Sequence, residues 1–123
     1  MSSIKLKNPI KILLEIEVTD IDRAIKFYET IFNFSVSEDS DLKNEIVFLE
    51  LPGTTTRLSL IKKDEEITPG SSYIAFFVEN LSETQKFLEK QGFLTSDIYH
   101  IPNGFSEFYF LDSEGNKIGI KSE

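Results

Sequence analysis

The chain has 123 residues, a formal net charge of −8 and a sequence pI of about 4.7, and 40% of its residues are hydrophobic. This acidic balance argues against nucleic acid as a partner, because phosphate binding requires a basic surface, and against anionic membrane surfaces. The absence of cysteine excludes disulfides, thiolate metal sites and cysteine nucleophiles. No apolar run approaches the roughly 20 residues that a membrane span needs, and no signal peptide is visible, so we expect a cytoplasmic protein.

One pattern occurs twice in the sequence, sixty residues apart. Residues 13–21 align with 73–81, and residues 58–60 align with 118–120. The repeat predicts a single domain over residues 1–123 that contains two copies of one unit. The first module covers about 10–63, residues 64–71 form a linker, and the second module covers about 72–121. Functional groups in such a chain tend to lie near the pseudo-twofold axis between the copies.

The first module begins with residues 11–19, whose alternation of apolar and polar side chains predicts a strand. Asp20 is expected to cap a helix that runs to Phe32, with Asn33 as its left-handed terminator. The strands expected after it are residues 34–37, 45–51 and 56–62.

The second module repeats this plan. Residues 73–79 predict a strand, and Asn80 with Glu83 resembles a capping box for a helix that ends at Gly92. The remaining strands are expected near residues 93–99, 105–111 and 117–121. Each module therefore reads βαβββ, an α+β arrangement.

Two stretches carry a resemblance to a known family. Residues 15–29 (EIEVTDIDRAIKFYE) pair a strand with a helix, and residues 108–118 (FYFLDSEGNKI) form a hairpin. They are similar to the opening strand and helix, and to the closing F-x-D-P-x-G-N hairpin, of the vicinal oxygen chelate superfamily, which includes glyoxalase I, bleomycin resistance proteins and extradiol dioxygenases. Ser113 replaces the usual proline. The resemblance covers about residues 10–121 and implies two tandem βαβββ modules that form a cup-shaped mixed β-sheet with helices on its outer face.

In the family's enzymes, a divalent metal is bound by residues of the first and last strands of each module. The resemblance maps these positions onto Leu13, Ser59, Tyr73 and Gly119, and the sixty-residue repeat pairs them in the same way. None of the four is a histidine or carboxylate, and neutral hydroxyls bind divalent cations poorly. The mapping predicts no metal and no other cofactor, and it argues against metal-dependent glyoxalase, dioxygenase or thiol-transferase activity. The single histidine, His100, is expected at the surface.

Strand parity from Leu13 and Tyr73 places seven candidate ligand-binding residues on the cup face: Glu15, Glu17, Arg57, Ser59, Tyr73, Phe77 and Lys117. Glu15 and Glu17 would lie about 6.5–7 Å apart. They could face a cationic ligand, act as acid and base, or pair with Arg57 or Lys117. The aromatic side chains could stack on a planar ligand or form core and dimer contacts. Both faces of residues 108–111 are apolar, so their inward face is not assigned.

These observations predict a small-molecule-binding protein of the glyoxalase and bleomycin-resistance type. It would sequester a cationic or aromatic organic ligand in the cup, without a metal and without catalysis. Two alternatives stay open: a metal-free isomerase or lyase with Glu15 or Glu17 as base, and a non-catalytic interaction domain whose cup is filled by its own side chains. In the family a second module closes the cup, often from the partner chain, so we expect a homodimer.

Overall fold

The computed structural model describes residues 13–41, 43, 45–70, 72–102 and 104–123. Residues 11 and 12 of the first expected strand lie outside this set. The elements of the first half are β1 (Leu13–Val18), α1 (Ile21–Phe32), β2 (Ser35–Val36), β3 (Ile46–Glu50) and β4 (Arg57–Lys62). The elements of the second half are β5 (Tyr73–Phe77), α2 (Leu81–Lys90), β6 (Tyr99–His100), β7 (Ser106–Leu111) and β8 (Lys117–Ser122). The predicted α+β fold of two tandem βαβββ modules is confirmed.

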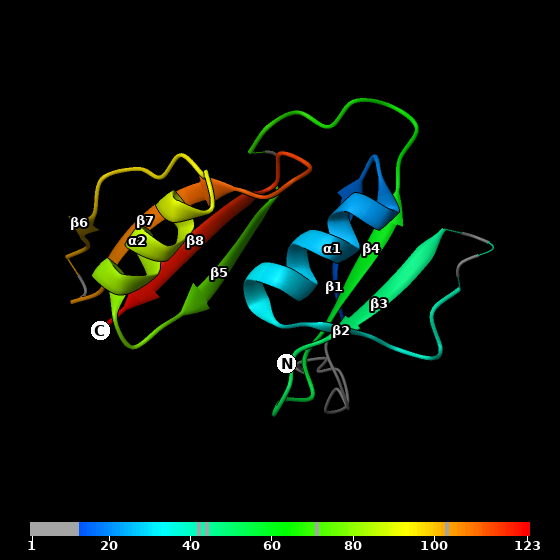
Figure 1. Ribbon diagram of the computed structural model, residues 1–123, viewed down its shortest axis with the longest axis horizontal. Helices are drawn as coiled ribbons and strands as arrows, with labels where there is room; N and C mark the ends of the chain where they lie inside the picture. The colour runs from blue at the N-terminus through cyan, green and yellow to red at the C-terminus, as the bar shows by residue number, and fades with distance from the viewer. Residues whose placement is uncertain (1–12, 42, 44, 71, 103) are drawn as a thin grey trace, which may run out of the picture.

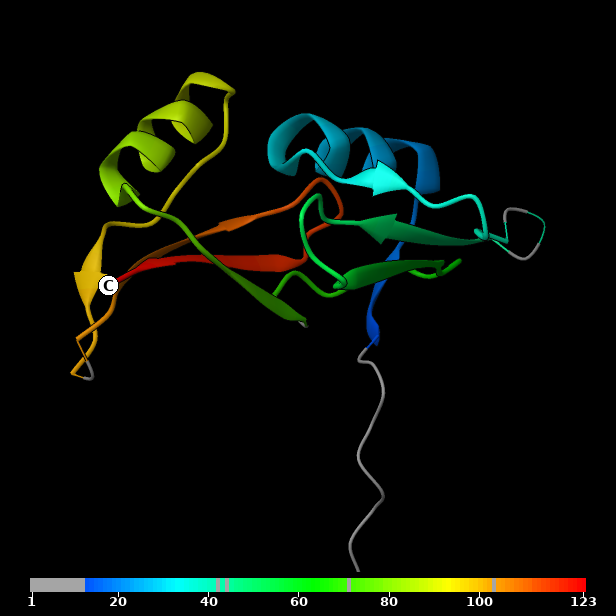
Figure 2. The ribbon, with the colours of Figure 1, turned by 90° about the horizontal axis from the view of Figure 1, so that it is seen from below.

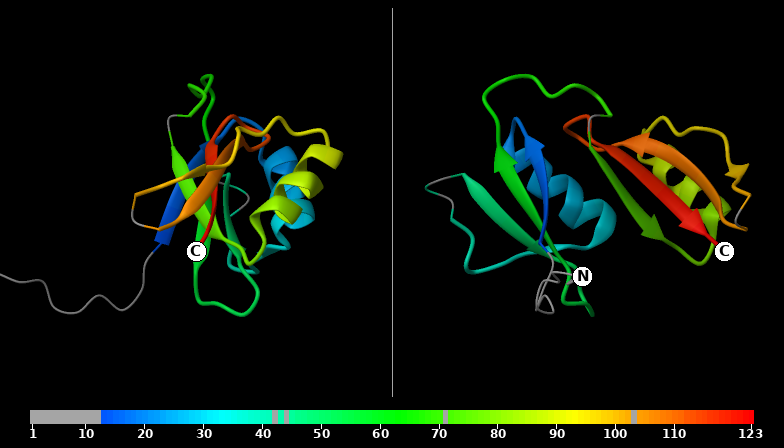
Figure 3. Two further views of the ribbon diagram at one scale, coloured as in Figure 1. Left: turned by 90° about the vertical axis from the view of Figure 1, so that its left-hand side faces the viewer. Right: turned by 180° about the vertical axis from the view of Figure 1, so that it is seen from behind.

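Each module forms its own four-stranded mixed sheet, in the orders β1-β4-β3-β2 and β5-β8-β7-β6. The first and last strands of each module are parallel neighbours, and the other pairs are antiparallel. The two modules lie side by side, joined by the linker that crosses at the top of Figure 1. The view from behind in Figure 3 shows β1 and β5 as the innermost strands of the two sheets.

Both helices begin as the sequence predicts and α1 also ends as predicted, whereas α2 ends at Lys90, two residues before the expected Gly92. The Asp20 side chain accepts a hydrogen bond from the Arg23 amide, and Asn33 ends α1 in the left-handed region at φ 60°. Asn80 caps α2 by accepting from the Glu83 amide at 3.0 Å. Figure 2 shows both helices on the same side of the two sheets. The opposite faces of the sheets are therefore free of helices, and we call them the concave faces. No helix in the described ranges is long and apolar enough to cross a membrane.

The core lies under the helices and continues from one module into the other. The Phe32 ring at the end of α1 stacks on Phe76 of β5, with centroids 4.2 Å apart, and Phe27 meets Phe93 edge-on at 5.5 Å. The helix-facing side chains of β4 and β8 are buried, as parity predicts. Leu14 departs from this expectation, since it is 43% exposed at the open edge of the first sheet.

The hairpin that carries the family resemblance joins the modules. The Glu114 side chain is fully buried and accepts hydrogen bonds from the Asp20 amide at 2.9 Å and from Arg23 Nε at 2.7 Å. Burial alone would raise the pKa of Glu114, but the hydrogen bonds from Arg23 and Asp20 outweigh it and lower the pKa to about 2. Asp112 accepts from the Tyr28 hydroxyl at 2.5 Å. This turn therefore fixes the second module to the start of α1.

The strand expected near residues 93–99 is wrong, because regular pairing is limited to Tyr99 and His100. Next to β7, the Ser96 amide donates to the Tyr109 carbonyl, but the Tyr109 amide donates to Ser96 Oγ instead of to a backbone carbonyl. A side-chain hydroxyl that takes a ladder position interrupts the ladder. The stretch before β6 is therefore irregular, and Leu94 within it is 93% exposed.

Candidate functional site

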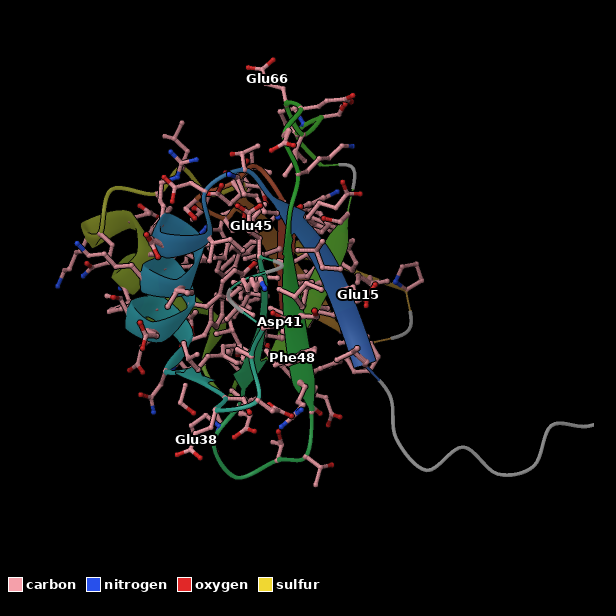
Figure 4. The ribbon with its side chains drawn as sticks, turned by 90° about the vertical axis from the view of Figure 1, so that its right-hand side faces the viewer. Glu15, Glu38, Asp41, Glu45, Phe48 and Glu66 are labelled. Atoms are coloured by element: carbon pink, nitrogen blue, oxygen red, sulfur yellow. The ribbon has the colours of Figure 1, made fainter. Side chains whose placement is uncertain are left out.

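The concave face of the first module is lined by alternate residues of β1, β4 and β3. Glu15 lies beside Ser59 in the parallel pairing of β1 with β4, and Phe48 lies on the other side of Ser59. Figure 4 shows Glu15 on the side of β1 that is turned away from the helices. Parity therefore places Glu15, Glu17, Arg57 and Ser59 on one concave face, as expected.

Charges on this first face are mostly paired within it. Arg57 forms ion pairs of 2.9 Å with both Asp39 and Glu50, and its guanidinium lies 5.6 Å from the centroid of the Phe48 ring. The Glu17 carboxylate lies 3.2 Å from Lys63 Nζ. The glutamates thus have no ion pair with Arg57 or Lys117 in the described part of the chain, because nearer groups satisfy Arg57 and Glu17.

Ser59 occupies the centre of the first face. It is fully buried, and its Oγ has no hydrogen-bond partner within the described residues. A buried hydroxyl without a partner loses its hydration without compensation, which costs about 1–3 kcal/mol. Ser59 is therefore a destabilising position in the isolated chain.

The concave face of the second module is organised around Glu107 of β7, which is only 4% exposed. Its carboxylate accepts hydrogen bonds from the hydroxyls of Tyr109 at 2.6 Å and Tyr99 at 2.8 Å, and it pairs with Lys121 at 3.2 Å. The Tyr73 hydroxyl approaches it at 3.5 Å. We call Glu107 with Tyr73, Tyr99 and Tyr109 the tyrosine cluster.

The tyrosine cluster sets the protonation states of its members. Burial would raise the pKa of Glu107, but the hydrogen bonds from Tyr109, Tyr99 and Lys121 outweigh it, so the pKa is lowered. The pKa of Tyr109 is raised, first by its hydrogen bond to Glu107. Glu107 is consequently a weaker base than an ordinary glutamate, and the tyrosines stay protonated. Since their protons point to Glu107, their oxygens offer acceptor lone pairs to the surroundings.

At the mapped metal positions of the second module, an aromatic ring lies where a ligating side chain would extend. The Tyr73 ring lies so close to Gly119 that an added Cβ would run into its hydroxyl group. In the first module the corresponding residues are Leu13 and Ser59. Neither pair fits a divalent cation, and the described residues contain no group of three or more His, Cys, Asp or Glu side chains able to hold one.

Lys117 and Phe77 complete the second face. The Lys117 ammonium lies 3.8 Å from the centroid of the Tyr109 ring and 5.9 Å from that of Tyr73. Among the described residues it has no carboxylate partner. Phe77 is 61% exposed and contacts Phe105 edge-on at 5.4 Å. In the part of the chain that the structure describes, this face is therefore an open aromatic surface on which Lys117 has no carboxylate partner.

The seven predicted residues fall into two groups on separate sheets, with Tyr73, Phe77 and Lys117 on the second. Sequence reasoning missed Glu107 and the inward orientation of Tyr109, because apolar residues occupy both faces of β7. The feature that could have indicated the orientation of Glu107 is the pairing of β7 with β8, because it sets Glu107 opposite Lys121. His100 is exposed in β6 with its Nδ1 2.6 Å from Ser106 Oγ, so its expected surface position is confirmed.

A family model described as the Glyoxalase/Bleomycin resistance protein/Dioxygenase superfamily matches residues 12–120. The chain belongs to this superfamily. A comparison with curated proteins gave no match.

Solved structures of other proteins share the fold at low identity. An integron cassette protein from the mobile metagenome of the Halifax Harbour sewage outfall is 22% identical, with a TM-score of 0.77 over 93% of this chain and 100% of its own. A Streptomyces antibiotic-binding protein, TnmS3, is 21% identical, with a TM-score of 0.75 over 89% of this chain and 92% of its own. Lactoylglutathione lyase from Agrobacterium tumefaciens is 18% identical, with a TM-score of 0.73 over 94% and 96%. These likenesses establish the fold.

Proposed function

We propose that this superfamily member binds an organic small molecule with a planar or aromatic group, without a metal, on the concave face of its second module. The observation that carries the proposal is the tyrosine cluster, in which one buried carboxylate holds Tyr99 and Tyr109 beside the exposed Tyr73. Aromatic rings fixed in this way offer a large stacking surface with little loss of side-chain freedom on binding.

The absence of a ligand set at the mapped positions supports binding over metal-dependent chemistry. Gly119 has no side chain, and its lack of a Cβ leaves room for the Tyr73 ring. An adjacent tyrosine thus covers the surface from which a metal ligand would extend. Function at this site would come from contacts with the ligand, and the antibiotic-binding neighbour from Streptomyces is a precedent for that role on this fold.

The protonation states also favour binding over proton transfer. A general base works best with a pKa near the working pH, and the lowered pKa of Glu107 moves it away from that range. The hydroxyl protons of Tyr99 and Tyr109 are engaged with the same carboxylate. The cluster is therefore suited to present fixed rings and acceptor oxygens to a ligand.

We further propose that a second copy of the chain closes the cup. Leu13, Tyr73 and Phe77 are 43%, 48% and 61% exposed, all on the concave faces. Exposed apolar side chains grouped on one side of a protein mark interaction surfaces.

The chain has no cysteine and would function in the reducing cytoplasm.

The metal-free part of the proposal is tested by elemental analysis of the purified protein, followed by calorimetric titration with nickel, zinc, manganese and iron(II). We expect no stoichiometric metal and no tight equivalent on titration. One tightly bound equivalent that is lost in Glu15→Gln or Glu17→Gln would contradict the proposal. Light scattering on a sizing column should give about twice the monomer mass of 14.1 kDa, and a monomer at tens of micromolar would contradict the closed cup.

A further inference from the structure

A cavity of about 540 Å³ opens beside the tyrosine cluster, at the end of β7 and the start of β8. It reaches the concave face through Tyr109, Leu111 and Lys117, and Phe93, Leu94 and Phe110 form much of its remaining wall. The irregular stretch before β6 shapes this wall, because regular pairing along β7 stops at Tyr99 and His100. The volume is suited to a small organic molecule.

Lys117 differs from the other cationic side chains of the two sheets. Arg57 pairs with Asp39 and Glu50, Lys62 with Glu45, and Lys121 with Glu107. For Lys117, the described residues provide two aromatic faces and no carboxylate. An ammonium group held over tyrosine rings remains able to donate hydrogen bonds to an anion.

We infer that Lys117 is the anion-binding end of this cavity, and that the ligand is an amphipathic organic acid. Its apolar body would lie against Leu94, Phe110 and Leu111, and its carboxylate would pair with the Lys117 ammonium. The inference rests on the proposed function, since it assigns a ligand class to the same concave face. It differs from the cationic preference that the sequence suggests, because Glu15 and Glu17 belong to the other sheet.

The test compares three ligands that share one ring system: naphthoate, naphthamide and naphthylmethylammonium. Their affinities are measured by calorimetry for the wild type, Lys117→Met and Lys62→Met. The two variants lose the same charge from different sheets, and circular dichroism confirms that both fold. We expect naphthoate to bind most tightly, and Lys117→Met to weaken it about tenfold while weakening naphthamide much less. Lys62→Met should retain the wild-type affinities.

A second variant locates the apolar body of the ligand. Leu94 is almost fully exposed, so Leu94→Ser should fold normally, and it should weaken naphthoate and naphthamide by the same factor. Binding of all three ligands with equal affinity in wild type and Lys117→Met would overturn the anion site and leave the proposed function standing. Preference for naphthylmethylammonium would also overturn it. Failure of all three to bind would overturn both proposals.

Discussion

The two concave faces share one backbone plan but differ in their polar chemistry. Where the first face pairs Ile46 with Ile61 across neighbouring strands, the second pairs Glu107 with Lys121 at the equivalent position. The first pair is apolar, whereas the second anchors two tyrosine hydroxyls. The repeat therefore preserves strand positions, but the polar pair at this position of the second module is an apolar pair in the first.

A second difference concerns the cation at the start of β4 and β8. Arg57 lies over Phe48 and has two carboxylate partners, whereas Lys117 lies over Tyr109 and has none in the described part of the chain. The first face neutralises its cation and the second leaves it available. Of the two faces, the second is therefore better suited to recognise a charged ligand.

The corresponding turns differ as well. Residues 112–116 of the second module pack against α1 through the buried Glu114, while residues 52–56 of the first are exposed. From these contrasts we expect substitutions at the interface between the modules to change stability most. Substitutions on the two concave faces should have smaller effects, and those of the exposed glutamates the smallest.

The largest effect is expected for Glu114→Gln. Removing the charge weakens the hydrogen bonds to Asp20 and Arg23 at a fully buried position, which should lower the free energy of unfolding by about 3 kcal/mol. Urea denaturation measures this change. Thr55→Ala in the exposed turn of the first module is the matched control and should stay within about 0.5 kcal/mol. Equal losses of stability in Glu114→Gln and Thr55→Ala would show that the two turns do not differ in their contribution to stability.

The same carboxylate predicts a pH dependence. The folded-state pKa of Glu114, about 2, lies below its ordinary value of 4.5, so its stabilisation is complete above pH 4.5 and is lost as the pH falls towards 2. The wild type should therefore lose stability over this window more steeply than Glu114→Gln. Parallel pH profiles for the two proteins would show that Glu114 is not the group responsible.

Next in size is Glu107→Gln, which leaves Lys121 without its partner and weakens the bonds to Tyr99 and Tyr109. We expect a loss of about 1–2 kcal/mol in denaturant unfolding, together with weaker ligand binding. Glu50→Gln on the first face is the control, since the Glu50 side chain is 45% exposed and Asp39 still pairs with Arg57. Its loss should be within about 0.5 kcal/mol. A larger loss of stability in Glu50→Gln than in Glu107→Gln would show that the carboxylate of the first face contributes more to stability than that of the second.

Ser59→Ala is expected to stabilise the protein by about 1 kcal/mol, because it removes a buried hydroxyl without a partner. Ser72→Ala should have the opposite sign, since Ser72 Oγ donates to Asn116 at 2.5 Å. Thermal unfolding of both variants tests the pair. Destabilisation by Ser59→Ala would show that the Ser59 hydroxyl has a partner in solution, and would make the first concave face a candidate for the ligand site.

The smallest effect is expected for Glu15→Gln combined with Glu17→Gln. Both side chains are exposed, and the Glu17 pair with Lys63 lies at the surface, so stability should change by at most about 0.5 kcal/mol. The ranking of naphthoate, naphthamide and naphthylmethylammonium in a thermal-shift assay should be the same as for the wild type. A lost or reordered ranking would place the ligand on the first module and restore the cationic preference.

Much of the fold could be predicted from local signals. Period-two alternation located β1, the caps Asp20 and Asn80 marked where the helices begin, and Asn33 marked where α1 ends. The strand expected near residues 93–99 could not be excluded in the same way, because the hydrogen bond between Ser96 and Tyr109 that interrupts it joins residues from different elements.

The site was only partly predictable for the same reason. Parity placed Tyr73 and Lys117 on a concave face, but Glu107 lies in a strand with apolar residues on both faces. Its role depends on the register of β7 with β8 and on three hydroxyls that converge from different strands. Such convergence is a tertiary property, and no local periodicity reports it.

The central claim is that the second concave face binds an organic ligand without a metal. It is tested most directly by a nuclear magnetic resonance titration of the metal-depleted protein, in the presence of a chelator, with naphthoate as the probe. We predict saturable shifts centred on Tyr73, Tyr109 and Lys117, with Glu15 and Ser59 unaffected. Shifts that require an added divalent metal, or that centre on Glu15 and Ser59, would contradict the account.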